Sequence, residues 1–198
     1  TFVDTVDQIV SYGVKKEIGH LYTDNGRSIN CNSISLKGRD VVNFGSCSYL
    51  GLEFDPRIKA ASKEAIDNFG TQFSESRAYV SISLYHELET LLERVFNGHV
   101  VITQSTTLGH MATIPVLICN STDCIIMDHQ VHNSIQMAVS MVKGQGIHVE
   151  LLRHNRIDLL EEKVQLLRGK YKRIWYMADG IYSMYGDKSP VKEIYNLM

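Results

Sequence analysis

The apolar and polar positions of the chain follow two different patterns, which meet near residue 50. The chain opens with an amphipathic stretch that carries Phe2, Val6 and Ile9 at helical spacing. Glycine and asparagine then interrupt the pattern until a short apolar run at 41–44, which predicts a strand. We interpret residues 1–50 as an N-terminal segment and residues 51–198 as the first part of a larger domain.

Helical patterns and short apolar runs alternate after residue 51. The first helix begins at Asp55-Pro56, an N-cap followed by a first-turn proline, and ends at Gly70. The second begins after residue 83 and ends at Asn97-Gly98. Such alternation predicts an α/β fold, a mostly parallel sheet with helices on both faces. Further helices are predicted at about 107–118, 132–143, 158–167 and from 191, and strands at 100–103, 124–127, 149–152 and 174–177.

Composition excludes several classes of protein. The 198 residues are 44% hydrophobic, which is enough for a sizeable core, and 20 basic and 22 acidic residues give a net charge of −2. No block of like charge and no run of about 20 apolar residues occurs, so neither nucleic-acid binding nor a membrane span is predicted. The cysteines lack zinc-type spacing and predict reduced thiols in a cytoplasmic protein; they are Cys31, Cys47, Cys119 and Cys124.

Candidate chemistry lies where predicted strands end, because functional residues of parallel sheets gather at the carboxyl ends of the strands. After 100–103 the chain turns into a helix at Ser105-Thr106-Thr107. Backbone N–H groups at a helix start lack internal partners, and together with the helix dipole they form an anion site that fits a phosphate. The alternative is ordinary capping of the helix by hydroxyl side chains.

A second strand end is Asp128, which is followed by His129, His132 and Ser134. These groups could hold a metal or stack on a flat cofactor. No further cysteine or glutamate joins them, so no metal site is predicted. The alternative is a capped helix start with incidental histidines.

The third strand end runs into a loop that carries Asp179, Ser183 and Gly186-Asp187. A carboxylate, a hydroxyl and glycines directly after a buried strand are typical of a site, although Gly186-Asp187 alone is also a simple turn. Because the three strands are predicted to lie in one parallel sheet, we expect their polar ends to converge at one edge of that sheet.

The segment 43–52, Asn-Phe-Gly-Ser-Cys-Ser-Tyr-Leu-Gly-Leu, resembles the opening motif of the α-oxoamine synthases. That family includes 8-amino-7-oxononanoate synthase and serine palmitoyltransferase. The similarity extends from Val41 to the C-terminus. It is most specific at 179–190, which is similar to the family's Glu-Gly-Val-Phe-Ser-Met-Asp-Gly-Asp loop.

The resemblance implies the large domain of a fold-type-I transferase that binds pyridoxal 5'-phosphate at the carboxyl edge of the sheet. The backbone amides of Thr106 and Thr107 would hold the phosphate. His132 would stack on the pyridine ring and act as the catalytic residue. Asp179 would take the place of the family's glutamate near the cofactor, and Ser183 would bond toward the cofactor's phenolic oxygen.

The chain also departs from the family pattern. Thr106-Thr107 replaces the usual glycine–aromatic pair, His110 replaces an asparagine, and Asp179 replaces the glutamate. Several such positions line substrate pockets in relatives, so the amino acid and the acyl chain stay open. The family's aspartate at the pyridine nitrogen and its cofactor-bearing lysine would follow Met198, so this stretch alone is expected to be inactive.

The implied activity is condensation of an amino acid with an acyl-CoA thioester, with loss of CO₂, to give an aminoketone. The family is usually homodimeric, with the segments around Tyr49 and Ser74 near the partner. Three alternatives stay open: an aminotransferase or aldol lyase on the same scaffold, a catalytically silent subunit of a heteromeric synthase, and a generic phosphate-binding α/β module.

Overall fold

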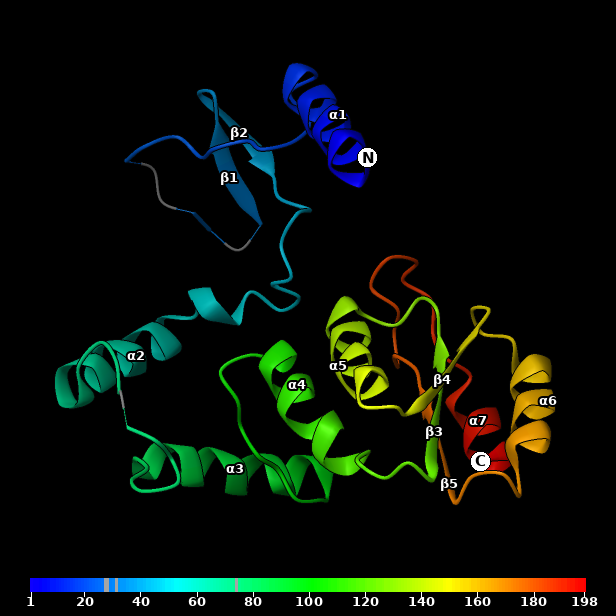
Figure 1. The fold of residues 1–198 in the computed structure, drawn as a ribbon. Helices are drawn as coiled ribbons and strands as arrows, with labels where there is room; N and C mark the ends of the chain where they lie inside the picture. The colour runs from blue at the N-terminus through cyan, green and yellow to red at the C-terminus, as the bar shows by residue number, and fades with distance from the viewer. Residues whose placement is uncertain (27–28, 31, 74) are drawn as a thin grey trace. The chain divides into compact units, whose positions relative to one another are not determined.

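The computed structural model describes residues 1–26, 29–30, 32–73 and 75–198, so Cys31 and Ser74 lie outside the described residues. The chain forms two compact units, Thr1–Ser81 and Ile82–Met198, which are described separately (Figure 1). The predicted division of the protein at residue 50 stays a prediction, because compactness within this chain does not by itself define domains.

The first unit begins with a helix, α1 (Phe2–Lys15), which covers the amphipathic opening of the sequence. Thr1 is its N-cap. The Thr1 side chain accepts the N–H of Asp4, and the Asp4 carboxylate accepts from the Thr1 backbone, which completes a capping box. The helix start is therefore determined by its own sequence.

An antiparallel hairpin of β1 (Ser33–Leu36) and β2 (Arg39–Val42) follows. Lys37 and Gly38 at its tip both have positive φ, 53° and 76°, as a two-residue hairpin turn requires. The predicted strand 41–44 is correct only in its first half. The β1 strand was not predicted, because two apolar residues alternating with two serines are too short a pattern to separate from a loop.

A 3₁₀ turn, η1 (Leu52–Phe54), leads into α2 (Pro56–Phe69). The Asp55 carboxylate accepts the N–H of Arg57 at 2.8 Å, and Gly70 ends the helix with φ 78°. The predicted N-cap, first-turn proline and glycine stop are all confirmed.

The second unit contains the parallel sheet and the helices around it. The predicted ranges agree with the observed bounds to within about one residue at each end, except for one strand. The elements are α3 (Ser83–Phe96), α4 (Thr106–Leu117), β3 (Asp123–Asp128), α5 (Asn133–Gly144), β4 (His148–Leu152), α6 (Ile157–Leu167), β5 (Arg173–Met177) and α7 (Val191–Leu197).

The strands are parallel in the order β4-β3-β5, and every residue of the central strand β3 is buried. Successive side chains of a strand point to opposite faces. Ile125 and Met127 pack with residues of α4 and α5, whereas Cys124 and Ile126 pack with α6 and α7. Helices therefore cover both faces, as Figure 1 shows, and the predicted α/β fold is confirmed.

The predicted strand at 100–103 is wrong. This segment forms neither a helix nor a strand, and it pairs with no strand in the described part of the chain. The N–H of Val100 donates to Glu93 at 3.3 Å, and the N–H of Ile102 donates to Glu89 at 2.9 Å. Carboxylates of α3 thus take the place of a neighbouring strand.

Across the described residues, every helix is too short or too polar to cross a bilayer. The described cysteines, Cys47, Cys119 and Cys124, are free thiols.

Leu160 and Leu166 lie on the same helix, α6, and test how that helix packs. Leu160 is fully buried, whereas Leu166 is 55% exposed. Leu160→Ala is expected to lower the free energy of unfolding by about 2–5 kcal/mol, because it leaves a cavity under the sheet. Leu166→Ala is expected to change it by less than about 0.5 kcal/mol. Urea denaturation measures both, and equal effects would contradict the described packing.

Candidate active site

The turn after β3 and the loop after β5 meet at the carboxyl end of the sheet (Figure 1). The backbone N–H of His132, at the start of α5, donates to the Asp179 carboxylate at 2.7 Å. Two residues that lie 47 positions apart and were predicted separately are therefore in direct contact. His132 is exposed and Asp179 is half-buried.

The His132 side chain caps its own helix. Its Nδ1 accepts the N–H of Ser134 at 3.2 Å and lies 2.7 Å from the Ser134 hydroxyl, which is buried. Because Nδ1 accepts, the proton of the neutral ring lies on Nε2. The outer edge of His132 therefore presents a hydrogen-bond donor.

His110 connects α4 to this group. Its Nδ1 lies 3.0 Å from the Ser134 hydroxyl oxygen. Since the hydroxyl proton of Ser134 goes to His132, the Nδ1–H of His110 donates to that oxygen. The first turns of α4 therefore lie beside His132, although the role of His110 was not predicted.

The start of α4 carries the predicted anion donors. The Ser105 side chain is the N-cap and accepts the N–H of Leu108 at 3.2 Å. Within the described residues, the N–H groups of Thr106 and Thr107 have no hydrogen-bond partner. Thr106 is exposed and Thr107 is half-buried. Unpaired donors at a helix N-terminus fit a phosphate.

Gly109 lets the extended segment before α4 pass close to the helix. A Cβ at Gly109 would lie 2.9 Å from Oγ1 of Thr103, whose hydroxyl donates to the Ser105 carbonyl. That approach is closer than carbon and oxygen tolerate. The absence of a side chain at Gly109 therefore helps to position the Ser105 turn.

The loop after β5 has its own hydrogen bonds and leaves Ser183 outside them. Tyr182 N–H donates to the Asp187 carbonyl at 2.9 Å, and Ser189 N–H donates to the Gly180 carbonyl at 3.1 Å. The Ser183 side chain is exposed, and in the described part of the chain it has no hydrogen bond to the other predicted site residues. It shares the loop with Asp179, and no hydrogen bond joins these two described residues.

A buried polar network behind this surface was not predicted. Asp128 is fully buried and accepts the N–H groups of Gln130 and Asn155, both at 2.8 Å. His154 Nδ1 lies 3.1 Å from Asp128, and His154 Nε2 lies 2.9 Å from Asp187. His154 follows the end of β4 by two residues, so the carboxyl-edge rule that indicated Asp128 also applies to it.

The network keeps Asp128 ionised. Burial raises the pKa of this carboxyl. The N–H groups of Asn155 and Gln130 and the ring of His154 lower it by more than burial raises it, so its pKa lies below the ordinary value. Burial and the Asp128 charge raise the pKa of Tyr182, whose hydroxyl donates to Asp128 at 3.2 Å. Asp128 is therefore a buried charge compensated from several segments.

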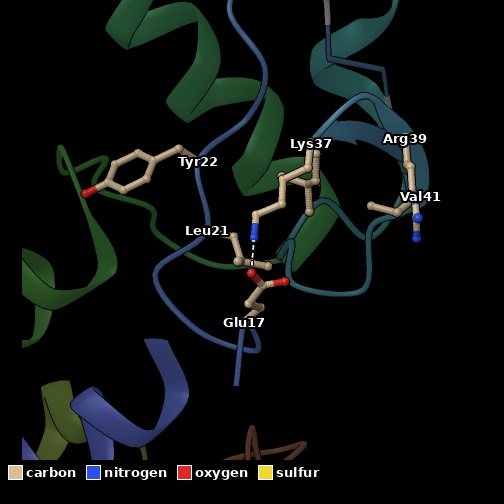
Figure 2. A pocket seen from close by; sticks show the side chains of 7 residues that line it. Glu17, Leu21, Tyr22, Lys37, Arg39 and Val41 are labelled. Carbon is tan, nitrogen blue, oxygen red and sulfur yellow. Dashed lines mark ion pairs between the residues drawn. The ribbon is translucent and has the colours of Figure 1, made fainter. Parts of the chain in front are cut away.

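A cavity of about 440 Å³ lies in the first unit (Figure 2). An ion pair between Lys37 and Glu17, 2.5 Å long, borders it. None of the predicted site residues belongs to it. Its lining residues are Glu17, Leu21, Tyr22, Leu36, Lys37, Arg39 and Val41. Elsewhere among the described residues, no group of three or more His, Cys, Asp or Glu is arranged to hold a metal ion.

Two of the curated relatives that match this chain carry the same name, 8-amino-7-oxononanoate synthase. The 8-amino-7-oxononanoate synthase of Fervidobacterium nodosum is 33% identical over 169 residues, which are 83% of this chain and 42% of the relative. That of Thermoanaerobacter pseudethanolicus is 28% identical over 197 residues, 98% of this chain and 47% of the relative. The chain thus spans less than half the length of these relatives.

Solved structures agree in fold. A serine palmitoyltransferase variant from S. paucimobilis with bound PLP-myriocin aldimine has a TM-score of 0.85 and 22% identity, covering 98% of this chain and 48% of that one. The serine palmitoyltransferase of Sphingomonas wittichii has a TM-score of 0.82 and 21% identity, covering 100% and 50%. The predicted fold-type-I architecture is confirmed.

The family model of class I and II aminotransferases matches residues 39–198, most of the chain. The relatives' names also agree with the α-oxoamine synthase resemblance seen in the motifs. The chain belongs to the class I and II aminotransferase family.

Proposed function

We propose that the protein is a pyridoxal 5'-phosphate-dependent acyltransferase. It condenses an amino acid with an acyl-CoA thioester, with loss of CO₂, and gives an aminoketone. The hydrogen bond from the His132 N–H to Asp179 carries this proposal, because it joins two strand ends into one polar surface beside α4. When bound, pyridoxal phosphate supplies an electron-withdrawing ring that stabilises negative charge at the α-carbon of the amino acid.

The start of α4 would hold the phosphate group. The N–H groups of Thr106 and Thr107 have no partner among the described residues, and the helix dipole adds positive potential at this end. The Ser105 hydroxyl caps the N–H of Leu108 instead, so the two free amides stay available. These donors fit a dianion better than a neutral ligand.

His132 would lie against the face of the pyridine ring and orient the substrate. Its ring is exposed, and the contact with Ser134 holds its orientation. The outward Nε2–H is a donor suited to the carboxylate of an amino acid. His110 supports this orientation through Ser134, so two side chains hold one imidazole.

Asp179 and Ser183 would complete the cofactor contacts from the loop after β5. Asp179 holds the backbone of His132 at 2.7 Å and lies half-buried next to it. Ser183 has an exposed hydroxyl, which would donate toward the phenolic oxygen of the cofactor. The shorter Asp179, in place of the family's glutamate, is consistent with a carboxylate that contacts backbone.

We also propose that the enzyme works as a homodimer in the cytoplasm. The resemblance to α-oxoamine synthases supports both statements, since members of that family usually pair through segments equivalent to the one around Tyr49. Tyr49 is 90% exposed in this chain, which is consistent with a partner contact.

Product analysis tests the proposed reaction. The whole enzyme, including the segment that would carry the cofactor-bearing lysine, should release CoA and CO₂ in equal amounts and form an aminoketone when given pyridoxal phosphate, an amino acid and an acyl-CoA. Amino-group transfer to a 2-oxo acid, or aldehyde release without acyl-CoA, would instead assign the alternative activities. Bound cofactor without any turnover across amino acids and acyl chains would favour a silent subunit.

Replacing Thr106 by proline tests the phosphate donors selectively. Proline is well tolerated at the first position of a helix, and it removes the N–H of Thr106. The extended backbone of Ser105, with φ −153° and ψ 154°, is compatible with a following proline. Cofactor affinity is expected to fall by about 10-fold or more, the size of one charge-assisted hydrogen bond.

Thr106→Ala is the matched control, because it removes the hydroxyl and keeps the N–H. Circular dichroism should show unchanged helix content in both variants, and fluorescence titration with pyridoxal phosphate measures the affinities. Equal affinities of the proline and alanine variants would show that this amide does not bind the phosphate.

Substitution of His132 tests its proposed role. In the whole enzyme, His132→Ala is expected to lower the condensation rate by roughly 100-fold, because the substrate loses its orientation, and to change the absorbance of the bound cofactor. His148→Ala is the control, since His148 is also partly exposed but begins β4 and pairs with Glu150 at 3.1 Å. Unchanged turnover and absorbance in the His132 variant would reject the role.

A further inference from the structure

His154 is bonded on both sides of its ring. Its Nδ1 lies 3.1 Å from the Asp128 carboxylate at the end of β3, and its Nε2 lies 2.9 Å from the Asp187 carboxylate in the loop after β5. The side chain is 17% exposed, and Asp128 is fully buried. Ionised carboxylates only accept hydrogen bonds, so both contacts require a proton on each ring nitrogen. The doubly protonated ring is therefore the form that bridges the two segments.

We propose that His154, hydrogen-bonded to both Asp128 and Asp187, is a positioning residue that fastens the loop of residues 179–188 to the end of β3. The loop carries Asp179, which accepts the N–H of His132 at 2.7 Å. Fastening the loop therefore fixes that contact. The benefit to cofactor binding rests on the proposed function, whereas the fastening itself does not.

Neighbouring contacts join the same two segments beside the His154 ring. Asn155 Nδ2 donates to Asp187 at 2.9 Å and to the Lys188 carbonyl at 3.2 Å, so the turn after β4 holds the end of the loop. The Tyr182 hydroxyl donates to Asp128 at 3.2 Å, and its ring meets His154 edge-on at 4.3 Å. Both His154 and Asn155 link Asp128 to Asp187, and His154 does so through the two nitrogens of one ring.

The surroundings of the ring favour its charged form. Burial lowers the pKa of His154, but the hydrogen bonds and charges of Asp187 and Asp128 raise it by more, so its pKa lies above the ordinary value of 6.5. The bridge is therefore complete when the ring is protonated, and it is lost as the pH rises through the raised pKa of His154. The titratable groups that face the ring are Asp128 from β3, Asp187, Tyr182 and Tyr185 from the loop, and His129 from the turn after β3.

Hydrogen exchange of the protein without cofactor tests the fastening. His154→Phe removes both hydrogen bonds but keeps a ring beside Tyr182. Asp128 still has the N–H groups of Gln130 and Asn155 and the Tyr182 hydroxyl, so the fold is expected to persist. His148→Phe is the control, because it removes an imidazole–carboxylate contact from the opposite end of β4.

In His154→Phe, the amides of Tyr182, Gly186 and Ser189 and the N–H of His132 are expected to exchange about 10-fold faster or more, while the amides of β3 stay unchanged. The control should leave all of them unchanged. Unchanged loop exchange in His154→Phe, or the same increase in both variants, would overturn the proposal.

A pH series separates a charged bridge from a purely structural ring. After correction for intrinsic chemistry, loop exchange in the unmodified protein should accelerate as the pH rises above the ordinary histidine range, and His154→Phe should lose this transition. Asp187→Asn removes one of the two charges and should move the transition to lower pH. An unmoved transition would overturn the role of the bridge. All these readouts precede cofactor addition, so failure of cofactor binding or turnover would count against the proposed function alone.

Discussion

A buried carboxylate at the end of a fully buried strand ties several segments of the second unit to one point. Asp128 cannot stay ionised away from water without donors around it. It receives them from the turn after β3, the turn after β4 and the loop after β5. Each of these segments must therefore approach the same point, so the three strand ends converge whatever the loops themselves prefer.

The exposed residues of the candidate site lie next to this buried network. Asp179 and His132 lie on the solvent side, and a single short hydrogen bond joins them. Ser134 is buried between two imidazoles and sets which nitrogen of His132 carries the proton. A rigid inner network thus supports a surface whose groups stay free to contact a ligand, which is how binding sites on strand ends keep their geometry.

The sequence predicted local structure well where the signals were local. The Asp55 cap, the proline after it and the stop at Gly70 act through neighbours within one turn, so their meaning does not depend on the rest of the chain. The strand predicted at 100–103 failed for the opposite reason. A strand needs a partner, and here the backbone donors of Val100 and Ile102 bond to carboxylates of α3.

The same division holds for the site. The chemistry of a helix start indicated Thr106, and polar residue types at strand ends indicated His132, Asp179 and Ser183. The motifs indicated the family, because all of these are properties of short segments. Only tertiary structure brought Asp179 to the N–H of His132 and placed His154 between Asp128 and Asp187, across 26 and 33 residues of chain. Contacts of that length depend on how strands align and helices pack, and no local pattern of apolar and polar residues specifies them.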